Sequence, residues 1–165
     1  MRTRRTYGTG PGLTEALRIL VVNAGSSTLK LRLLARDDQL LVEDAMPADH
    51  AGFDEDAVAA VVARLGEIDA VGHRFVHGGP RLTGPVRLDA EVEDYLHSLV
   101  DLAPLHQPPA LAGVALMRRL LPDAPAVACL DTAFHTAFTA HPQFHLRQRA
   151  GLFFLVSVCR PAFGA

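Results

Sequence analysis

The sequence lacks the features typical of nucleic-acid-binding, membrane-spanning or disulfide-stabilised proteins. Among its 165 residues, 16 basic and 18 acidic side chains give a formal net charge of −2, which offers no positive excess for a nucleic acid or an acidic membrane surface. No apolar run approaches the ~20 residues that a membrane-spanning helix needs. Two cysteines, Cys129 and Cys159, are too few for a disulfide framework, so we expect a reducing, cytoplasmic location.

Two common nucleotide-binding motifs are also absent. The sequence has no G-x-x-x-x-G-K-[ST] loop, and "GTGPG" at 8–12 does not complete G-x-G-x-x-G. Any nucleotide chemistry must therefore come from another architecture. Residues 1–17 are basic and rich in glycine and proline, without the apolar core of a secretory signal, and are predicted to form a flexible N-terminal extension.

Apolar patterns of the strand and helix types follow one another along the rest of the chain. In 28–34, Leu29, Leu31 and Leu33 alternate with charged residues, as in a strand with one buried face. The patterns predict strands at 18–23, 28–34, 39–45, 68–76 and 126–130, and helices at 54–65, 89–102 and 110–121. Strands first, then alternating helices and strands, indicate an α/β fold with a sheet and flanking helices.

The first two predicted strands are joined by a small polar turn, within "VVNAGSSTLKL" at 21–31. Its small residues would let a ligand approach the backbone, and hydroxyl and N–H groups suit phosphate oxygens, with Lys30 adding a positive charge nearby. The same residues also suit an ordinary hairpin turn that faces solvent. The pattern alone leaves both interpretations open.

Two further segments place arginine, histidine or aspartate residues near the ends of predicted strands. In "AVGHRFVHGGP" at 70–80, Arg74 is suited to clamp a carboxylate or phosphate, or to pair with a structural carboxylate. His73 and His77 would share a strand face, and without a third ligand we interpret them as hydrogen-bonded structural histidines. In "CLDTAFH" at 129–135, Asp131 follows a buried strand, where an open α/β sheet commonly places catalytic groups, although it also suits a helix N-cap.

A third segment, "LAPLHQPP" at 102–109, holds His106 in a proline-stiffened loop. This loop is suited either to position a substrate or to end the preceding helix. The chain resembles the acetate kinase family from about residue 20 to residue 135, because it contains "VVNAGSSTLKL", "VGHRFVHGG", "LAPLHQPP" and "LDTAFH" in this order and at sensible separations. That family lies in the superfamily of sugar kinases, actin and heat-shock ATPases.

The resemblance implies an actin-like ATPase (ribonuclease H-like) domain, here incomplete, and reversible transfer of the γ-phosphoryl group of ATP to acetate with Mg²⁺. The implied partners are acetate and ATP or ADP, with no nucleic acid and no membrane, in a cytoplasmic homodimer. Propionate or butyrate remain alternative substrates, because one methylene in an apolar pocket is worth only about 1–3 kcal/mol.

The resemblance also implies roles for individual residues. Asp131 is the catalytic acid/base group, Arg74 binds the substrate carboxylate, and Asn23 belongs to the metal site. The remaining implied positions are Lys30, Ser26 and Thr28 for ATP, and Val76, Leu105 and His106 for the substrate. Phosphoryl transfer depends on positioning and charge neutralisation, so a clamp, a metal and a phosphate-facing turn are expected parts.

The chain departs from the family pattern at three places. Thr28 stands where serine is common, which keeps the hydroxyl group, and Gln107 stands where relatives usually have asparagine. The expected motifs do not follow His135. We therefore expect an acetate-kinase-like domain at 18–135 and a divergent, frameshifted or non-native tail at 136–165. Residues 151–158, "GLFFLVSV", are apolar, uncharged and prone to β-aggregation. A truncated chain without activity is one expectation, and a non-catalytic remnant that binds phosphate or carboxylate is the alternative.

Overall fold

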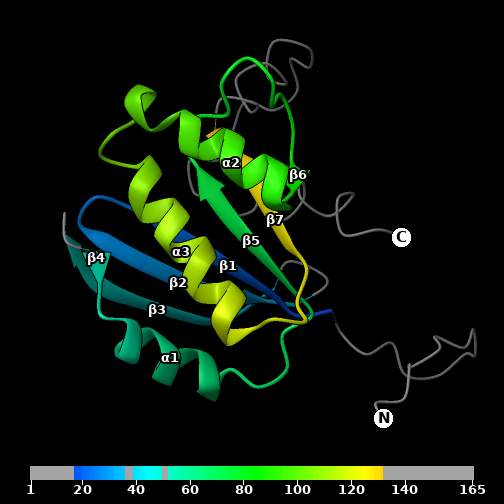
Figure 1. Ribbon diagram of the computed structural model, residues 1–165. Helices are drawn as coiled ribbons and strands as arrows, with labels where there is room; N and C mark the ends of the chain where they lie inside the picture. The colour runs from blue at the N-terminus through cyan, green and yellow to red at the C-terminus, as the bar shows by residue number, and fades with distance from the viewer. Residues whose placement is uncertain (1–16, 36–38, 50–51, 132–165) are drawn as a thin grey trace, which may run out of the picture.

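The computed structural model describes residues 17–35, 39–49 and 52–131, and within them a mixed seven-stranded sheet carries three helices on one face (Figure 1). The strand order is β4-β3-β2-β1-β5-β7-β6. Neighbours from β1 to β4 are antiparallel, β5 is parallel to both β1 and β7, and β6 is antiparallel to β7. The predicted α/β fold with a mixed sheet and flanking helices is confirmed.

The strands agree closely with the predicted ranges. Their bounds are β1 Ile19–Ala24, β2 Thr28–Leu34, β3 Leu40–Asp49, β4 Gly52–Phe53, β5 Ala70–Phe75, β6 Val86–Arg87 and β7 Ala126–Leu130. In β2, Leu29, Leu31 and Leu33 are buried while Lys30 is exposed, as the alternation predicts. The two-residue strands β4 and β6 were not predicted, because two residues carry no readable period.

Two of the three helices begin with side-chain caps. Helix α1, Glu55–Arg64, follows Asp54, whose carboxylate accepts a hydrogen bond from the Ala57 N–H at 3.0 Å. Helix α2, Ala90–Ser98, follows Asp89, whose carboxylate accepts from the Val92 N–H at 2.9 Å. The predicted helix at 89–102 ends earlier than expected, and a separate 3-10 turn, η1 Val100–Leu102, follows it.

The third helix, α3 Gln107–Leu120, begins three residues before its predicted start. The two prolines that were predicted to lie in a loop occupy its first turn, where their missing N–H groups break no helical hydrogen bond. Gln107 is completely buried, and its Nε2 donates to the Leu96 carbonyl at 3.2 Å. Gln107, one of the departures from the family pattern, therefore joins the start of α3 to the end of α2.

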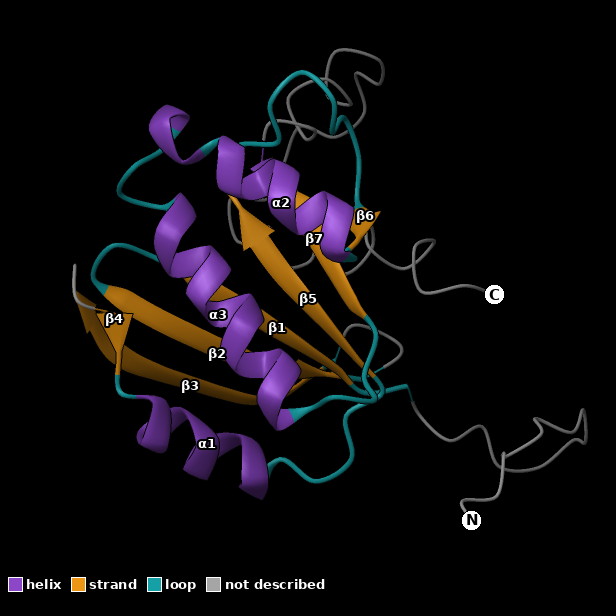
Figure 2. Cartoon of the chain, viewed as in Figure 1, coloured by secondary structure: helices purple, strands orange, loops and turns teal. Residues whose placement is uncertain are grey.

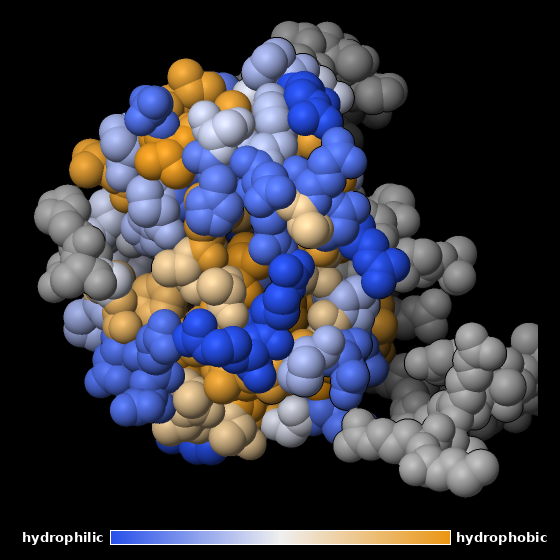
Figure 3. Space-filling view, viewed as in Figure 1, coloured by the Kyte–Doolittle hydropathy of each residue, from blue (hydrophilic) through white to orange (hydrophobic). Residues whose placement is uncertain are grey.

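The two faces of the sheet are covered differently (Figure 2). Apolar side chains of α1 and α3 pack with alternate residues of β1, β2 and β5, among them Leu20, Val22 and Leu31. The opposite face carries a second buried cluster that includes Ile19, Val21 and Val127. In Figure 3 the helix-covered face presents mostly hydrophilic residues to solvent, with smaller hydrophobic areas among them. Among the described residues, no helix is long and apolar enough to cross a membrane.

The chain leaves β5 through a glycine pair that leaves no room for side chains. A Cβ on Gly78 would lie 2.6 Å from the Leu82 carbonyl oxygen, and one on Gly79 would lie 2.4 Å from the Tyr95 hydroxyl. Gly79 also has φ of 59°, in the left-handed region. The absence of side chains at these two positions therefore lets the segment after β5 approach α2 closely.

Candidate active site at the carboxyl ends of β1, β5 and β7

Three of the predicted site residues meet in one hydrogen-bonded cluster. The guanidinium of Arg74 donates from Nε to Asp131 Oδ1 at 3.0 Å and from Nη2 to Asp131 Oδ2 at 2.6 Å, a bidentate ion pair. Its Nη1 donates to Asn23 Oδ1 at 3.2 Å. The Arg74 and Asp131 side chains are 40% and 32% exposed, so the pair lies at the surface of the described domain.

The register of the central parallel strands explains why these residues meet. Val22 of β1 pairs with His73 of β5, so the next residue of each strand, Asn23 and Arg74, lies at the same level. Arg74 pairs with Cys129 of β7, and Asp131 follows two residues later, which returns it to the same face. Parallel strands thus bring residues that are far apart in sequence to one end of the sheet.

Lys30 lies beside this cluster on the same face. It pairs directly with Asn23 across the antiparallel β1–β2 ladder, and directly opposed residues project to the same side of a sheet. The lysine is exposed and is the only one in the sequence. Its placement is compatible with a role in binding phosphate.

The turn between β1 and β2 is held by backbone hydrogen bonds. The Gly25 N–H donates to the Thr28 carbonyl at 2.9 Å, and the Ser27 carbonyl accepts from the Ala48 N–H at 3.1 Å. Ser26 and Thr28 are partly buried. These contacts are those of an ordered hairpin turn, so the predicted phosphate contacts of Ser26 and Thr28 stay a prediction.

The other predicted substrate residues lie on two segments outside the hydrogen-bonded cluster. Val76 directly follows β5 and is partly buried. Leu105 is 54% exposed and His106 is partly buried, in the loop between η1 and α3. This loop lies at the end of the sheet toward which β5 points (Figure 1). The predicted role of these three side chains stays a prediction.

The two histidines differ from each other, and the prediction of hydrogen-bonded structural histidines is only partly right. His77 accepts a hydrogen bond at Nδ1 from the Gly79 N–H at 2.8 Å. His73 is 2% exposed on the helix-covered face, and its Nε2 has no hydrogen-bond partner among the described residues. Burial, together with the positive charge of Arg118, lowers the pKa of His73 to about 3. His73 is therefore neutral at any physiological pH.

The cluster offers two oxygen donors of the kind that Mg²⁺ prefers. Among the described residues, no group of three or more His, Cys, Asp or Glu side chains is placed to hold a metal ion. Mg²⁺, however, is commonly held by one or two protein oxygens together with substrate phosphates and water. The Asn23 amide oxygen and the Asp131 carboxylate converge on one guanidinium and fit that requirement.

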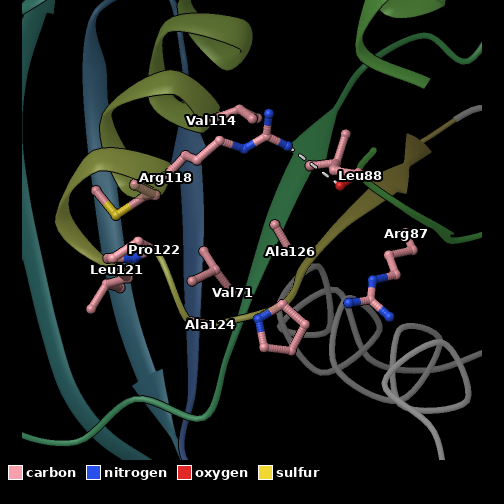
Figure 4. Close-up of a pocket in the computed structure, with 11 residues that line it drawn as sticks. Val71, Arg87, Leu88, Val114, Arg118, Leu121, Pro122, Ala124 and Ala126 are labelled. Carbon is pink, nitrogen blue, oxygen red and sulfur yellow. Dashed lines mark hydrogen bonds between the residues drawn. The ribbon is translucent and has the colours of Figure 1, made fainter. Parts of the chain in front are cut away.

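A separate hollow of about 170 Å³ lies at the other end of β7 (Figure 4). Its lining includes Val71, Ala126 and Arg118, on the helix-covered side. Arg118 of α3 donates to the Leu88 carbonyl at 3.4 Å and forms an ion pair with Glu93 of α2. Because Ala126 begins β7 whereas Asp131 follows its end, this hollow is not part of the Arg74 cluster.

The contact between Arg74 and Asp131 was not foreseen, although each residue had been proposed separately for the site. They lie 57 positions apart, and no local period connects them. One signal was available: a lone arginine near the end of one inner strand and a carboxylate just past the end of another are expected to meet if the strands are parallel neighbours.

Comparison with known proteins points to one family. Residues 53–146 match the Acetokinase family, and the match extends past the last of the four motifs. An acetate kinase from Fervidobacterium nodosum is 38% identical over 75% of this chain and 38% of its own length. One from Rhizobium meliloti is 38% identical over 80% of this chain and 42% of its own length.

Solved structures give the same result for the fold. A Porphyromonas gingivalis acetate kinase aligns with TM-score 0.63 and 28% identity over 89% of this chain and 43% of that one. A propionate kinase from Francisella tularensis aligns with TM-score 0.64 and 25% identity over 81% of this chain and 42% of that one. The chain thus spans about two fifths of the length of these relatives.

Proposed function

The chain belongs to the acetokinase family, and we propose that it carries the carboxylate-binding and part of the phosphate-binding machinery of a kinase that transfers the γ-phosphoryl group of ATP to acetate. The observation that carries this proposal is the cluster of Arg74, Asp131 and Asn23 at the carboxyl ends of three adjacent strands. Ligands of open α/β sheets bind at this edge.

Each residue of the cluster has a distinct proposed task. Arg74 orients the acetate carboxylate by charge-assisted hydrogen bonds, so that one carboxylate oxygen faces the phosphoryl group. Asp131 is the acid/base group, and together with Asn23 it would hold Mg²⁺. When bound, Mg²⁺ neutralises charge on the transferring phosphates. Lys30, at the same edge, adds a positive charge for the phosphates, and Ser26 and Thr28 contribute hydroxyl groups.

The substrate is proposed to be a short carboxylic acid, acetate first. Both acetate and propionate kinases are among the structural relatives, so propionate is the competing substrate. Val76, Leu105 and His106 are the proposed contacts of the substrate's remaining part. Because one methylene changes binding in an apolar pocket by about 1–3 kcal/mol, the ratio of kcat/KM for the two acids distinguishes them.

The decisive experiment is a chimera. Residues 1–135 of this chain are joined to the corresponding remainder of the Porphyromonas gingivalis acetate kinase, and acetyl phosphate is measured as its hydroxamate. We expect ATP- and magnesium-dependent turnover of acetate. The 165 residues alone should give no product above a blank, since they span about two fifths of the relatives. A folded chimera without turnover would contradict the proposal, and acetate binding without turnover would favour the non-catalytic binding module.

Lys30 permits an independent test of the phosphate side, because it is the only lysine in the sequence. An amine-reactive reagent should modify it in the chimera, and ATP with magnesium should protect it, as measured by peptide mass spectrometry. The N-terminal amine serves as the internal control, since it should react equally with and without ATP. Equal labelling of Lys30 under both conditions would remove it from the ATP site.

A further inference from the structure

The guanidinium that is proposed to bind the substrate already binds a carboxylate of the same chain. Asp131 occupies the Nε and Nη2 side of Arg74 with both of its oxygens, at 3.0 and 2.6 Å. Asn23 takes one further N–H from Nη1, at 3.2 Å. An arginine side chain has five N–H donors, so the described residues use three of them, and the bidentate edge at Nε and Nη2 is filled.

A second carboxylate at Arg74 therefore meets two obstacles. It must either replace Asp131 on the filled edge or bind at the remaining N–H groups beside the Asp131 negative charge. In both cases the attraction of Arg74 for an anion is reduced, because Asp131 already neutralises its charge. Lys30 lies on the same face, but it is on β2, and its side chain forms no hydrogen bond or ion pair with Asp131 or any other described residue.

We propose that Asp131 is an internal ligand of Arg74 that keeps the carboxylate clamp closed, and that a divalent cation at Asp131 opens it. This inference rests on the proposed function and adds a coupling between metal binding and acetate binding. The Asp131 oxygens that accept from Arg74 are the same atoms that would hold Mg²⁺, so the cation and Arg74 compete for them. Mg²⁺ and acetate then bind cooperatively, and each raises the affinity of the other by the same factor.

The coupling has a direct functional consequence. Without a metal the closed clamp binds acetate weakly, so the carboxylate is oriented only when the metal that accompanies the nucleotide is present. The partial exposure of both side chains, 40% and 32%, lets the pair exchange partners without unfolding the strands that carry it.

The test measures acetate binding by the full 165-residue chain, using an NMR titration of ¹³C-labelled acetate with and without MgCl₂. We expect Asp131→Asn to bind acetate about tenfold more tightly than wild type in the absence of metal, because it frees a charge-assisted bidentate site. Magnesium should tighten acetate binding by wild type and leave Asp131→Asn unchanged. Arg74→Ala should lose acetate binding under all conditions.

Asp94→Asn is the matched control, because it removes one carboxylate charge from an exposed position on α2. It should bind acetate as wild type does. Equal or weaker acetate binding by Asp131→Asn would overturn the proposal, as would acetate binding that survives in Arg74→Ala. If Asp131→Asn does not fold, the wild-type titration decides, and the absence of a magnesium effect contradicts the proposal.

These results are separable from those that test the proposed function. If the chimera turns over acetate and Asp131→Asn shows no gain in acetate affinity, the proposed kinase function is supported and the closed clamp is contradicted. If the chimera is inactive and Asp131→Asn shows the expected gain, the closed clamp is supported and the proposed kinase function is contradicted.

Discussion

His73 and Arg74 are neighbours on β5, yet they lie in opposite environments. His73 faces the helices, is 2% exposed and is held neutral by burial, with a pKa of about 3. Arg74 faces the other side, is 40% exposed at its side chain and forms a bidentate ion pair. One strand thus carries a residue that bears on stability and, one position later, a residue that we assign to function.

The difference follows from what each side of the strand contacts. On the helix-covered side, His73 lies near the positive charge of Arg118, which itself pairs with Glu93. On the other side, Arg74 lies within reach of oxygen atoms from two neighbouring strands. Substitutions on the two sides should therefore change different measurements, and the predictions below are ordered by the expected size of the effect.

The largest effect is expected for Arg74 in the active chimera. Arg74→Ala should raise the acetate KM and lower kcat, because it removes a carboxylate clamp that also orients the acetate for transfer. We expect kcat/KM to fall about 10²- to 10³-fold, as when one charge-stabilising donor is removed from an active site. Asp131→Asn should mainly lower kcat, without raising KM.

Arg119→Ala serves as the control for this comparison, because Arg119 is 56% exposed on α3 and pairs with the exposed Glu55. Its kinetic constants should equal those of the unmodified chimera. If Arg74→Ala were as active as Arg119→Ala, the cluster on the exposed side of β5 would have a structural role, and the contrast between the two sides would not hold.

The glycine pair after β5 should give the largest effect on stability. Gly79→Ala places a Cβ at positive φ and 2.4 Å from the Tyr95 hydroxyl, so we expect the free energy of unfolding to fall by about 3 kcal/mol. Gly84→Ala is the control, since nothing lies within 4 Å of its Cβ position. Urea unfolding followed by circular dichroism measures both. Equal stability of the two variants would show that the segment after β5 adapts freely.

His73 should make folding sensitive to acid. Between pH 6.5 and about 3, the histidine is protonated in the unfolded chain but not in the folded one, so lowering the pH stabilises the unfolded state. Between pH 7 and pH 5 this should remove about 2 kcal/mol from the free energy of unfolding. His73→Gln should lose that component, so the stability difference between wild type and variant should change by the same amount.

His97→Gln is the matched control, because His97 is exposed on α2. The stability difference between it and wild type should stay nearly constant over the same pH range. A constant difference for His73→Gln as well would mean that the buried histidine is protonated in the folded protein, contrary to the contrast with Arg74.

The sequence predicted those parts of this comparison that depend on local patterns. Alternation in β2 identified the buried side of the strand, and the start of α1 was predicted one residue early, at its Asp54 cap. The prolines after His106 were assigned to a loop because proline usually interrupts a helix, whereas the first turn tolerates it. The resemblance to a family named Arg74 and Asp131 individually as candidate site residues, and their roles stay a prediction.

Other parts could not be predicted because they depend on the register between distant strands. The contact of Arg74 with Asp131 requires β5 and β7 to be adjacent and parallel, which no local period reveals. The unpartnered Nε2 of His73 depends on which side of β5 the helices cover. Gln107 was predicted to lie in a loop, yet it is completely buried against the end of α2.

The smallest effect concerns a second arginine–carboxylate pair on the same face of the sheet as Arg74. Arg32 of β2 and Glu43 of β3 are cross-strand neighbours, with 2.7 Å between Arg32 Nη2 and Glu43 Oε1. Glu43 is 42% exposed, so solvent screens the pair. Glu43→Gln should therefore lower the free energy of unfolding by only about 0.5 kcal/mol and leave the turnover of the chimera unchanged. Urea unfolding and the hydroxamate assay measure the two quantities. A loss of activity as large as that of Arg74→Ala would mean that the functional surface extends across β2 to β3, rather than ending at the strands that carry Arg74 and its partners.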